Sequence, residues 1–141
     1  MAALPDSAQV VIVGGGIVGC SIAYHLTQIG IRDVLLLERK QLTSGTTWHA
    51  AGLVGQLRAT QNMTRLAQYT TELFADLSAE TGLETGFRKT GSMTLAMNSE
   101  RLEELARQAT MAKAFGVECE LIGTDFIHEQ WPGLKTTDVL G

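Results

Sequence analysis

Three glycines follow a short apolar run at the spacing of a dinucleotide-binding turn. Gly14, Gly16 and Gly19 form a Gly-x-Gly-x-x-Gly motif directly after Val10–Val13. Gly14 permits a tight turn, Gly16 lets the backbone approach a pyrophosphate, and Gly19 lets the next helix pack closely on the strand. A pyrophosphate would then lie on the N–H groups at the helix N-terminus, where the helix dipole favours negative charge. The motif therefore predicts a nucleotide site.

An acidic side chain stands where such a motif needs one. Glu38 ends a second apolar run, Val34–Leu37, about twenty residues beyond the last glycine, where its carboxylate can accept hydrogen bonds from both hydroxyls of an adenosine ribose. The alternative is an ordinary glycine-rich turn with an unrelated acid nearby. The context of two strands favours the nucleotide site.

A hydroxyl-rich loop follows the second run. Residues 43–52 are small and have no sustained period, and ligands bind beyond the ends of the strands in open α/β sheets. Ser44, Thr46 and Thr47 offer short hydroxyls, and Gly45 offers an unobstructed backbone, which suit phosphate groups or the edge of a cofactor ring. The alternative is a solvated loop, in which His49 is structural or exposed and Trp48 packs against its neighbours.

The composition excludes several classes of partner. The 141 residues are 45% hydrophobic and 18% charged, and a net charge of −4 leaves no basic patch for nucleic acid. Cys20 and Cys119 have neither disulfide nor metal-ligand spacing, so no metal is expected. Residues 10–23 are too short to span a bilayer. No targeting signal is visible at the N-terminus, as in a bacterial cytoplasmic enzyme or a mitochondrial matrix enzyme without its presequence.

The hydrophobic period predicts the elements that position these residues. The first fifty residues predict a βαβ unit whose helix ends at Gly30. Further along we expect a helix at 63–80 closed by Gly82, a half-buried β pair at 87–89 and 93–97, a helix capped by Asn98, a strand at 118–122, and a short helix from Thr124 that ends before Pro132. The fold class is therefore α/β: a Rossmann-like βαβ unit, followed by the start of a mixed α+β domain. Residues 1–85 are assigned to the N-terminal part of a cofactor-binding domain, and 86–141 to the start of a substrate domain that is incomplete in this chain.

The glycine motif, Glu38 with Arg39, and the run Ser-Gly-Thr-Thr-Trp-His-Ala-Ala-Gly at 44–52 together resemble the FAD-dependent amine oxidoreductases of the D-amino-acid-oxidase-like superfamily. Within that superfamily the likeness is closest to the sarcosine and dimethylglycine dehydrogenases, and it extends through residues 80–83 and 91–95. It implies that FAD is held by Gly14, Gly15, Gly16, Gly19, Glu38, Arg39, Ser44, Gly45, Thr46, Thr47, His49 and Gly52. It further implies that His49 is joined covalently to the 8α-methyl group of the flavin.

The resemblance implies an enzyme that oxidises a small secondary or tertiary amine, such as sarcosine or dimethylglycine, by hydride transfer to flavin N5. Members are much longer, so the chain is expected to be an N-terminal fragment, with the residues that contact the amine lying elsewhere. An electron-transfer flavoprotein or O2 is the expected electron acceptor, and tetrahydrofolate the expected ligand of a C-terminal region. The alternatives are an oxidase of another small amine or amino acid, and a catalytically silent flavin-fold regulatory subunit.

Overall fold

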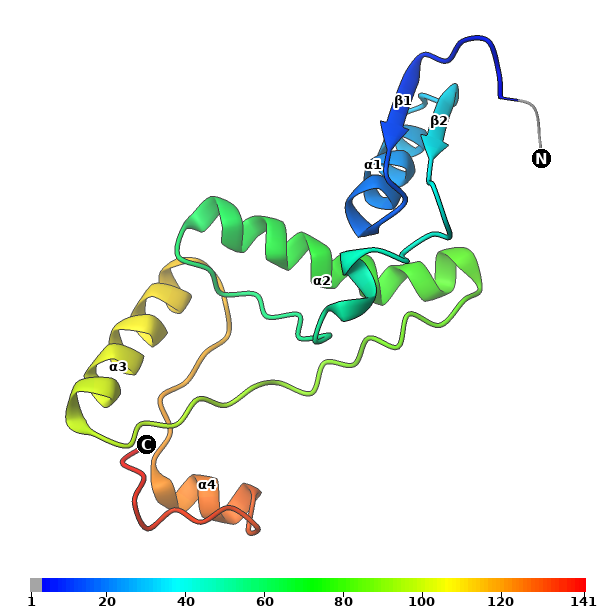
Figure 1. The fold of residues 1–141 in the computed structure, drawn as a ribbon. Helices are drawn as coiled ribbons and strands as arrows, with labels where there is room; N and C mark the ends of the chain where they lie inside the picture. The colour runs from blue at the N-terminus through cyan, green and yellow to red at the C-terminus, as the bar shows by residue number, and fades with distance from the viewer. Residues whose placement is uncertain (1–3) are drawn as a thin grey trace. The chain divides into compact units, whose positions relative to one another are not determined.

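The computed structural model describes residues 4–141 and divides the chain into two compact units, one extending to Leu53 and the other spanning Val54–Gly141. The first unit contains strand β1 (Val10–Val13), helix α1 (Ile17–Gln28) and strand β2 (Val34–Leu37), drawn in blue to cyan in Figure 1. The second contains helices α2 (Gln61–Thr81), α3 (Ser99–Ala114) and α4 (Thr124–Gln130).

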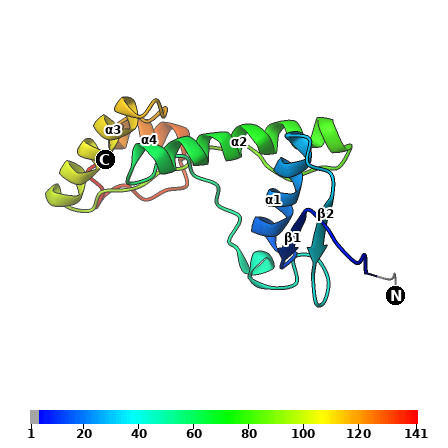
Figure 2. The ribbon, with the colours of Figure 1, turned by 90° about the horizontal axis from the view of Figure 1, so that it is seen from above.

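The first unit is a parallel β–α–β unit. β1 and β2 pair in parallel from Val10 opposite Val34 to Val13 opposite Leu37, so both strands end at the same level. Helix α1 lies against one face of this pair (Figure 2). Ile12 is buried, whereas Val13 is 84% exposed. Gly30, at φ +90°, follows the last turn of α1 in the left-handed conformation that ends a helix. The predicted α/β class and βαβ unit are confirmed.

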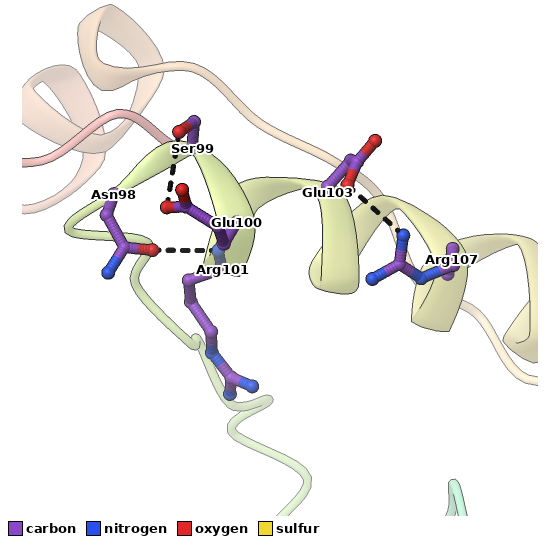
Figure 3. Close-up of polar contacts among 6 residues, drawn as sticks. All are labelled: Asn98, Ser99, Glu100, Arg101, Glu103 and Arg107. Carbon is purple, nitrogen blue, oxygen red and sulfur yellow. Dashed lines mark hydrogen bonds and ion pairs between the residues drawn. The ribbon is translucent and has the colours of Figure 1, made fainter.

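The three helices of the second unit lie where the sequence predicts them. The Thr60 hydroxyl accepts a hydrogen bond from the Met63 N–H at the start of α2, and Gly82, at φ +71°, ends that helix. At the start of α3, Asn98 Oδ1 accepts a 2.8 Å bond from the Arg101 N–H (Figure 3). These local caps fix both helix starts.

The predicted β pair at 87–89 and 93–97 and the predicted strand at 118–122 are wrong. The structure has non-helical, unpaired backbone through most of 83–97 and in 117–123, and Figure 1 shows the first of these segments as a long path between α2 and α3. Ala96 exchanges two 2.8 Å backbone hydrogen bonds with the C-terminal residues Leu140 and Gly141. One such contact is too short for a ladder, and a strand needs a continuous partner. Alternation of apolar residues reports burial on one side but does not supply that partner.

The core of the second unit is small. Its fully buried apolar side chains are Ala96, Ala112 and Ile127, and Thr64 is buried with its hydroxyl hydrogen-bonded to the backbone. On the solvent-facing side of α3, Arg107 donates a 3.3 Å hydrogen bond to Glu103, one helical turn earlier (Figure 3). Among residues 4–141, none of the helices combines the length and apolarity needed to cross a membrane. The predicted domain boundary near residue 85 falls inside this unit and stays a prediction.

Candidate cofactor site

The glycine turn connects β1 to α1 in a conformation that other residues would disturb. Gly14 has φ +108°, and its N–H donates a 2.8 Å hydrogen bond to the Leu37 carbonyl oxygen. A Cβ on Gly19 would collide with the Gly14 carbonyl oxygen, so the helix approaches the turn as closely as glycine allows. A Cβ on Gly15 would lie 2.6 Å from Leu42 Cδ2 and 3.0 Å from Glu38 Cβ. Gly14, Gly15 and Gly19 therefore each have a steric or conformational reason to be glycine.

The N-terminus of α1 has no acidic or capping side chain of its own. Its N-cap residue is Gly16, which contributes no side chain, and the first turn of α1 has no acidic residue. Helices α2 and α3, by contrast, begin with a local threonine or asparagine cap. A helix N-terminus with no acidic residue in its own first turn favours an anionic ligand, because its dipole and N–H groups are directed at that position. This turn therefore fits a pyrophosphate.

Glu38 lies against the glycine turn. Its Oε2 accepts a 2.9 Å hydrogen bond from the Gly15 N–H, and its Oε1 accepts a 2.9 Å bond from the Lys40 N–H. These hydrogen bonds lower the pKa of Glu38 below its ordinary value. The bond from Gly15 is the largest cause, the bond from Lys40 is the next, and Arg39 makes a smaller contribution. Each carboxylate oxygen has a second lone pair, so both can still accept a ribose hydroxyl. Arg39 itself is exposed.

The segment after β2 returns to the glycine turn. The Thr43 N–H donates a 2.8 Å hydrogen bond to the Gly15 carbonyl oxygen, with Thr43 held at φ +64°. A short 3₁₀ helix, η1 (Thr46–His49), follows, and its Thr47 hydroxyl accepts a 3.0 Å hydrogen bond from the Ile17 N–H of α1. Two hydrogen bonds thus join this segment to the turn. The sequence gives no signal for the contacts of Leu42 and Thr43, because both depend on the path of the chain.

His49 ends η1 and is exposed. Its imidazole lies beside the indole of Trp48, with ring centroids 3.9 Å apart and planes at 43°. Trp48 is 68% exposed, so it packs against its neighbour His49 at the surface of the first unit. Its assignment as a packing residue stays a prediction. Both rings are accessible to a ligand.

The structure brings some of the predicted residues together and leaves others apart. Gly14, Gly15, Gly16, Gly19, Glu38 and Thr47 share direct contacts around the start of α1. Exposed positions along the same segment hold Arg39, Ser44, Gly45, Thr46, His49 and Gly52. Within residues 4–141, no three His, Cys, Asp or Glu side chains gather as a metal site would require. The arrangement suits binding of a nucleotide cofactor, whose own ring carries the redox chemistry.

Three curated proteins are similar in sequence to this chain over nearly its whole length. The mouse protein "Sarcosine dehydrogenase, mitochondrial" is 40% identical over 139 residues, which are 98% of this chain and 15% of that protein. Rat "Dimethylglycine dehydrogenase, mitochondrial" is 42% identical over 135 residues, 96% of this chain and 16% of that protein. The mouse "Pyruvate dehydrogenase phosphatase regulatory subunit, mitochondrial" is 40% identical over 139 residues, which are 99% of this chain and 16% of that protein. The chain thus spans less than a fifth of the length of these relatives.

A solved structure shares the fold. The L-proline dehydrogenase from P. horikoshii superposes with a TM-score of 0.87 at 29% identity, over 97% of this chain and 36% of that chain. The family described as "FAD dependent oxidoreductase" matches residues 9–141, nearly the whole sequence. The chain therefore belongs to the FAD dependent oxidoreductase family.

Proposed function

We propose that this chain is the cofactor-holding part of a longer FAD-dependent oxidoreductase that acts on a small secondary or tertiary amine such as sarcosine or dimethylglycine. The observation that carries the proposal is the arrangement around the start of α1: the strained glycine turn, Glu38 on the Gly15 N–H, and η1 on the Ile17 N–H. The two dehydrogenases similar to this chain support the choice of amine.

The residues of the turn have separate tasks in this proposal. Gly14, Gly15 and Gly16 form a backbone surface for the pyrophosphate, and Gly19 holds α1 against it. Glu38 accepts hydrogen bonds from the ribose hydroxyls. The exposed segment from Arg39 through Ser44, Gly45, Thr46 and Thr47 to Gly52 continues along the cofactor towards its ring.

His49 is the residue that we propose to bind the flavin covalently. Its ring is exposed, and an imidazole nitrogen would supply the electron pair for a bond to the 8α carbon of the flavin. One 8α C–H bond would break, that proton and the imidazole N–H proton would leave, and the two electrons taken up by the flavin would pass to O2. Bound FAD would supply the hydride acceptor at N5. The residues that position the amine are expected in the longer part of the protein, because this chain spans less than a fifth of the length of the relatives similar to it.

The partners and location follow from the same proposal. An electron-transfer flavoprotein or O2 would accept the electrons, and a C-terminal region would bind tetrahydrofolate. The mitochondrial names of the two dehydrogenases favour a mitochondrial matrix protein, and the bacterial cytoplasm is the alternative.

A catalytically silent regulatory subunit is the second candidate. The similarity to the phosphatase regulatory subunit, at the same 40% identity, favours it. The intact glycine turn favours an FAD-binding protein in either case, because a chain without the cofactor would not need the strained φ of Gly14. An oxidase of another small amine or amino acid is the third candidate.

The test uses the full natural protein that carries this sequence. We expect a flavin spectrum, flavin that stays with the polypeptide after acid precipitation, and bleaching of that spectrum by sarcosine or dimethylglycine without oxygen. His49→Ala should release the flavin into the acid supernatant, whereas His128→Ala, a change at another exposed histidine, should retain it.

Each outcome separates the candidates. Stably bound flavin that no amine reduces would indicate the regulatory subunit. Reduction of the flavin by a different amine or amino acid would indicate the third candidate, an oxidase of that compound. Acid-labile flavin in the wild-type protein would refute the attachment to His49 while leaving FAD binding intact. A colourless protein that takes up no FAD would refute the whole proposal.

A further inference from the structure

Helix α1 is capped by a residue from a distant part of the sequence. Its own N-cap position is Gly16, and the Ile17 N–H instead donates to the hydroxyl of Thr47, thirty residues further along the chain. In α2 and α3, the capping side chain precedes the helix directly. A remote cap fixes the relative position of two segments as well as satisfying a helix N–H.

The second of these segments carries His49. Thr47 and His49 both belong to η1, a single turn of four residues, so a displacement of Thr47 displaces His49 as well. Thr47 is half-buried, while its neighbours in η1 are exposed. The bond between the Thr43 N–H and the Gly15 carbonyl oxygen lies before η1 and leaves its far end unfixed. Among the described hydrogen bonds, the one between Thr47 and the Ile17 N–H therefore holds η1 against the start of α1.

Gly16 accommodates this contact. A Cβ built on Gly16 would lie 3.1 Å from Thr47 Oγ1, closer than most Cβ atoms come to any neighbour. The φ of Gly16 is −81°, which every residue can adopt, so backbone strain does not require glycine here. The close approach of the Thr47 hydroxyl favours glycine here, because any Cβ would push that hydroxyl away by a few tenths of an ångström. The second glycine of the motif thus makes room for η1 as well as for a cofactor.

We propose that Thr47 is a positioning residue: its hydroxyl, as the remote cap of α1, fixes η1 on the glycine turn and so sets the position from which His49 reaches the flavin. This inference rests on the proposed covalent attachment at His49. Thr47 takes no part in the bond itself. Its effect is geometric, and a displacement on the order of 1 Å at a reacting atom lowers a rate by about a hundredfold.

The test replaces the hydroxyl and keeps the shape of the side chain. Apoprotein of the full natural chain, produced under riboflavin limitation, is mixed with FAD, and acid-stable flavin is measured against time. Thr47→Val removes the hydroxyl, and Thr47→Ser retains it. Thr27→Val is the matched control, because Thr27 lies at the other end of α1 and its hydroxyl donates to the Tyr24 carbonyl oxygen of the same helix.

A second measurement does not depend on flavin. Amide hydrogen exchange at Ile17 in the apoprotein reports the hydrogen bond to Thr47 directly. We expect exchange at least about tenfold faster in Thr47→Val and near the wild-type rate in Thr47→Ser and Thr27→Val. Circular dichroism of each variant shows whether it has folded. If Thr47→Val has not folded, Thr47→Ala replaces it as the variant without the hydroxyl, and Thr47→Ser remains the variant that retains it.

The expected result is attachment slowed by about ten- to a hundredfold in Thr47→Val, restored in Thr47→Ser and unchanged in Thr27→Val. Attachment at the wild-type rate in a folded Thr47→Val protein would overturn the proposal while the attachment to His49 stands. Slower attachment with unchanged exchange at Ile17 would also overturn it, because the effect would not pass through the cap. A wild-type protein without acid-stable flavin would instead refute the attachment to His49, and the positioning role with it.

Discussion

Gly19→Ala should weaken FAD binding by about a hundredfold. The added Cβ would collide with the Gly14 carbonyl oxygen, a backbone atom that no side-chain rotation can move away. Relief therefore requires α1 and the turn to separate by a distance on the order of 1 Å. The turn already holds Gly14 at φ +108°, and its N–H is fixed on Leu37, so it has little freedom to yield.

The magnitude follows from the cost of overpacking. One added methyl group in a tightly packed site costs about 1–3 kcal/mol, and contact with backbone places this site at the upper end. When the binding-competent turn is disfavoured by about 3 kcal/mol, the apparent affinity for FAD falls by the same free energy, roughly a hundredfold. Gly123→Ala is the control, because a Cβ there meets nothing within 4 Å and its φ of −90° suits alanine.

The measurement is the quenching of FAD fluorescence on binding to apoprotein, made in a His49→Ala background so that binding stays reversible. We expect a dissociation constant raised about a hundredfold by Gly19→Ala and changed less than about twofold by Gly123→Ala. Wild-type affinity for Gly19→Ala, with an unchanged thermal transition, would refute the close approach of α1 to the turn.

Four further outcomes are expected. In the same assay, Glu38→Ala should weaken FAD binding by roughly ten- to a hundredfold, because a charge-assisted hydrogen bond to the ribose is lost; a change below about twofold would assign Glu38 to the turn alone. Since the pKa of folded Glu38 is lowered, its stabilisation of the turn is present above the unfolded pKa and is lost as the pH falls below about 4.5 through the folded value. Circular dichroism during acid titration should therefore show a shallower loss of structure in Glu38→Gln, and identical profiles would contradict this. Asn98→Ala should destabilise α3 by about 1 kcal/mol, measured as faster amide exchange in its first turn, and unchanged exchange would count against the cap. Residues 1–141 produced alone should self-associate in sedimentation experiments, because Val13 is 84% exposed and Ile29 73%; a monomer with stoichiometric FAD would contradict this.

Local patterns predict most of the helices and the βαβ unit. Gly30 and Gly82 end their helices in the left-handed conformation, and Asn98 begins one with its own side chain, so each signal acts within a few residues. The β pair at 87–97 fails for the opposite reason. A strand requires a hydrogen-bonded partner strand, which local sequence does not specify. Here, in the part of the chain that the structure describes, Ala96 forms backbone hydrogen bonds only with Leu140 and Gly141.

The candidate site divides in the same way. The positive φ of Gly14 and the close packing at Gly19 follow from the motif, because backbone geometry alone demands them. The contact of Thr47 with the Ile17 N–H, and that of Leu42 with Gly15, could not be predicted. They depend on how a loop returns to a turn about thirty residues earlier. The 68% exposure of Trp48 could not be predicted either, since an aromatic residue in a loop is compatible with a buried or an open position.

Every residue that we assign to the cofactor lies between Gly14 and Gly52, inside the first compact unit. Contacts around the start of α1 are made by side chains and backbone from this single uninterrupted stretch. Exchange of this single stretch between two genes would therefore move the turn, the proposed ribose acid and the proposed attachment histidine together. A breakpoint between Ile17 and Thr47 would separate α1 from the residue that caps it.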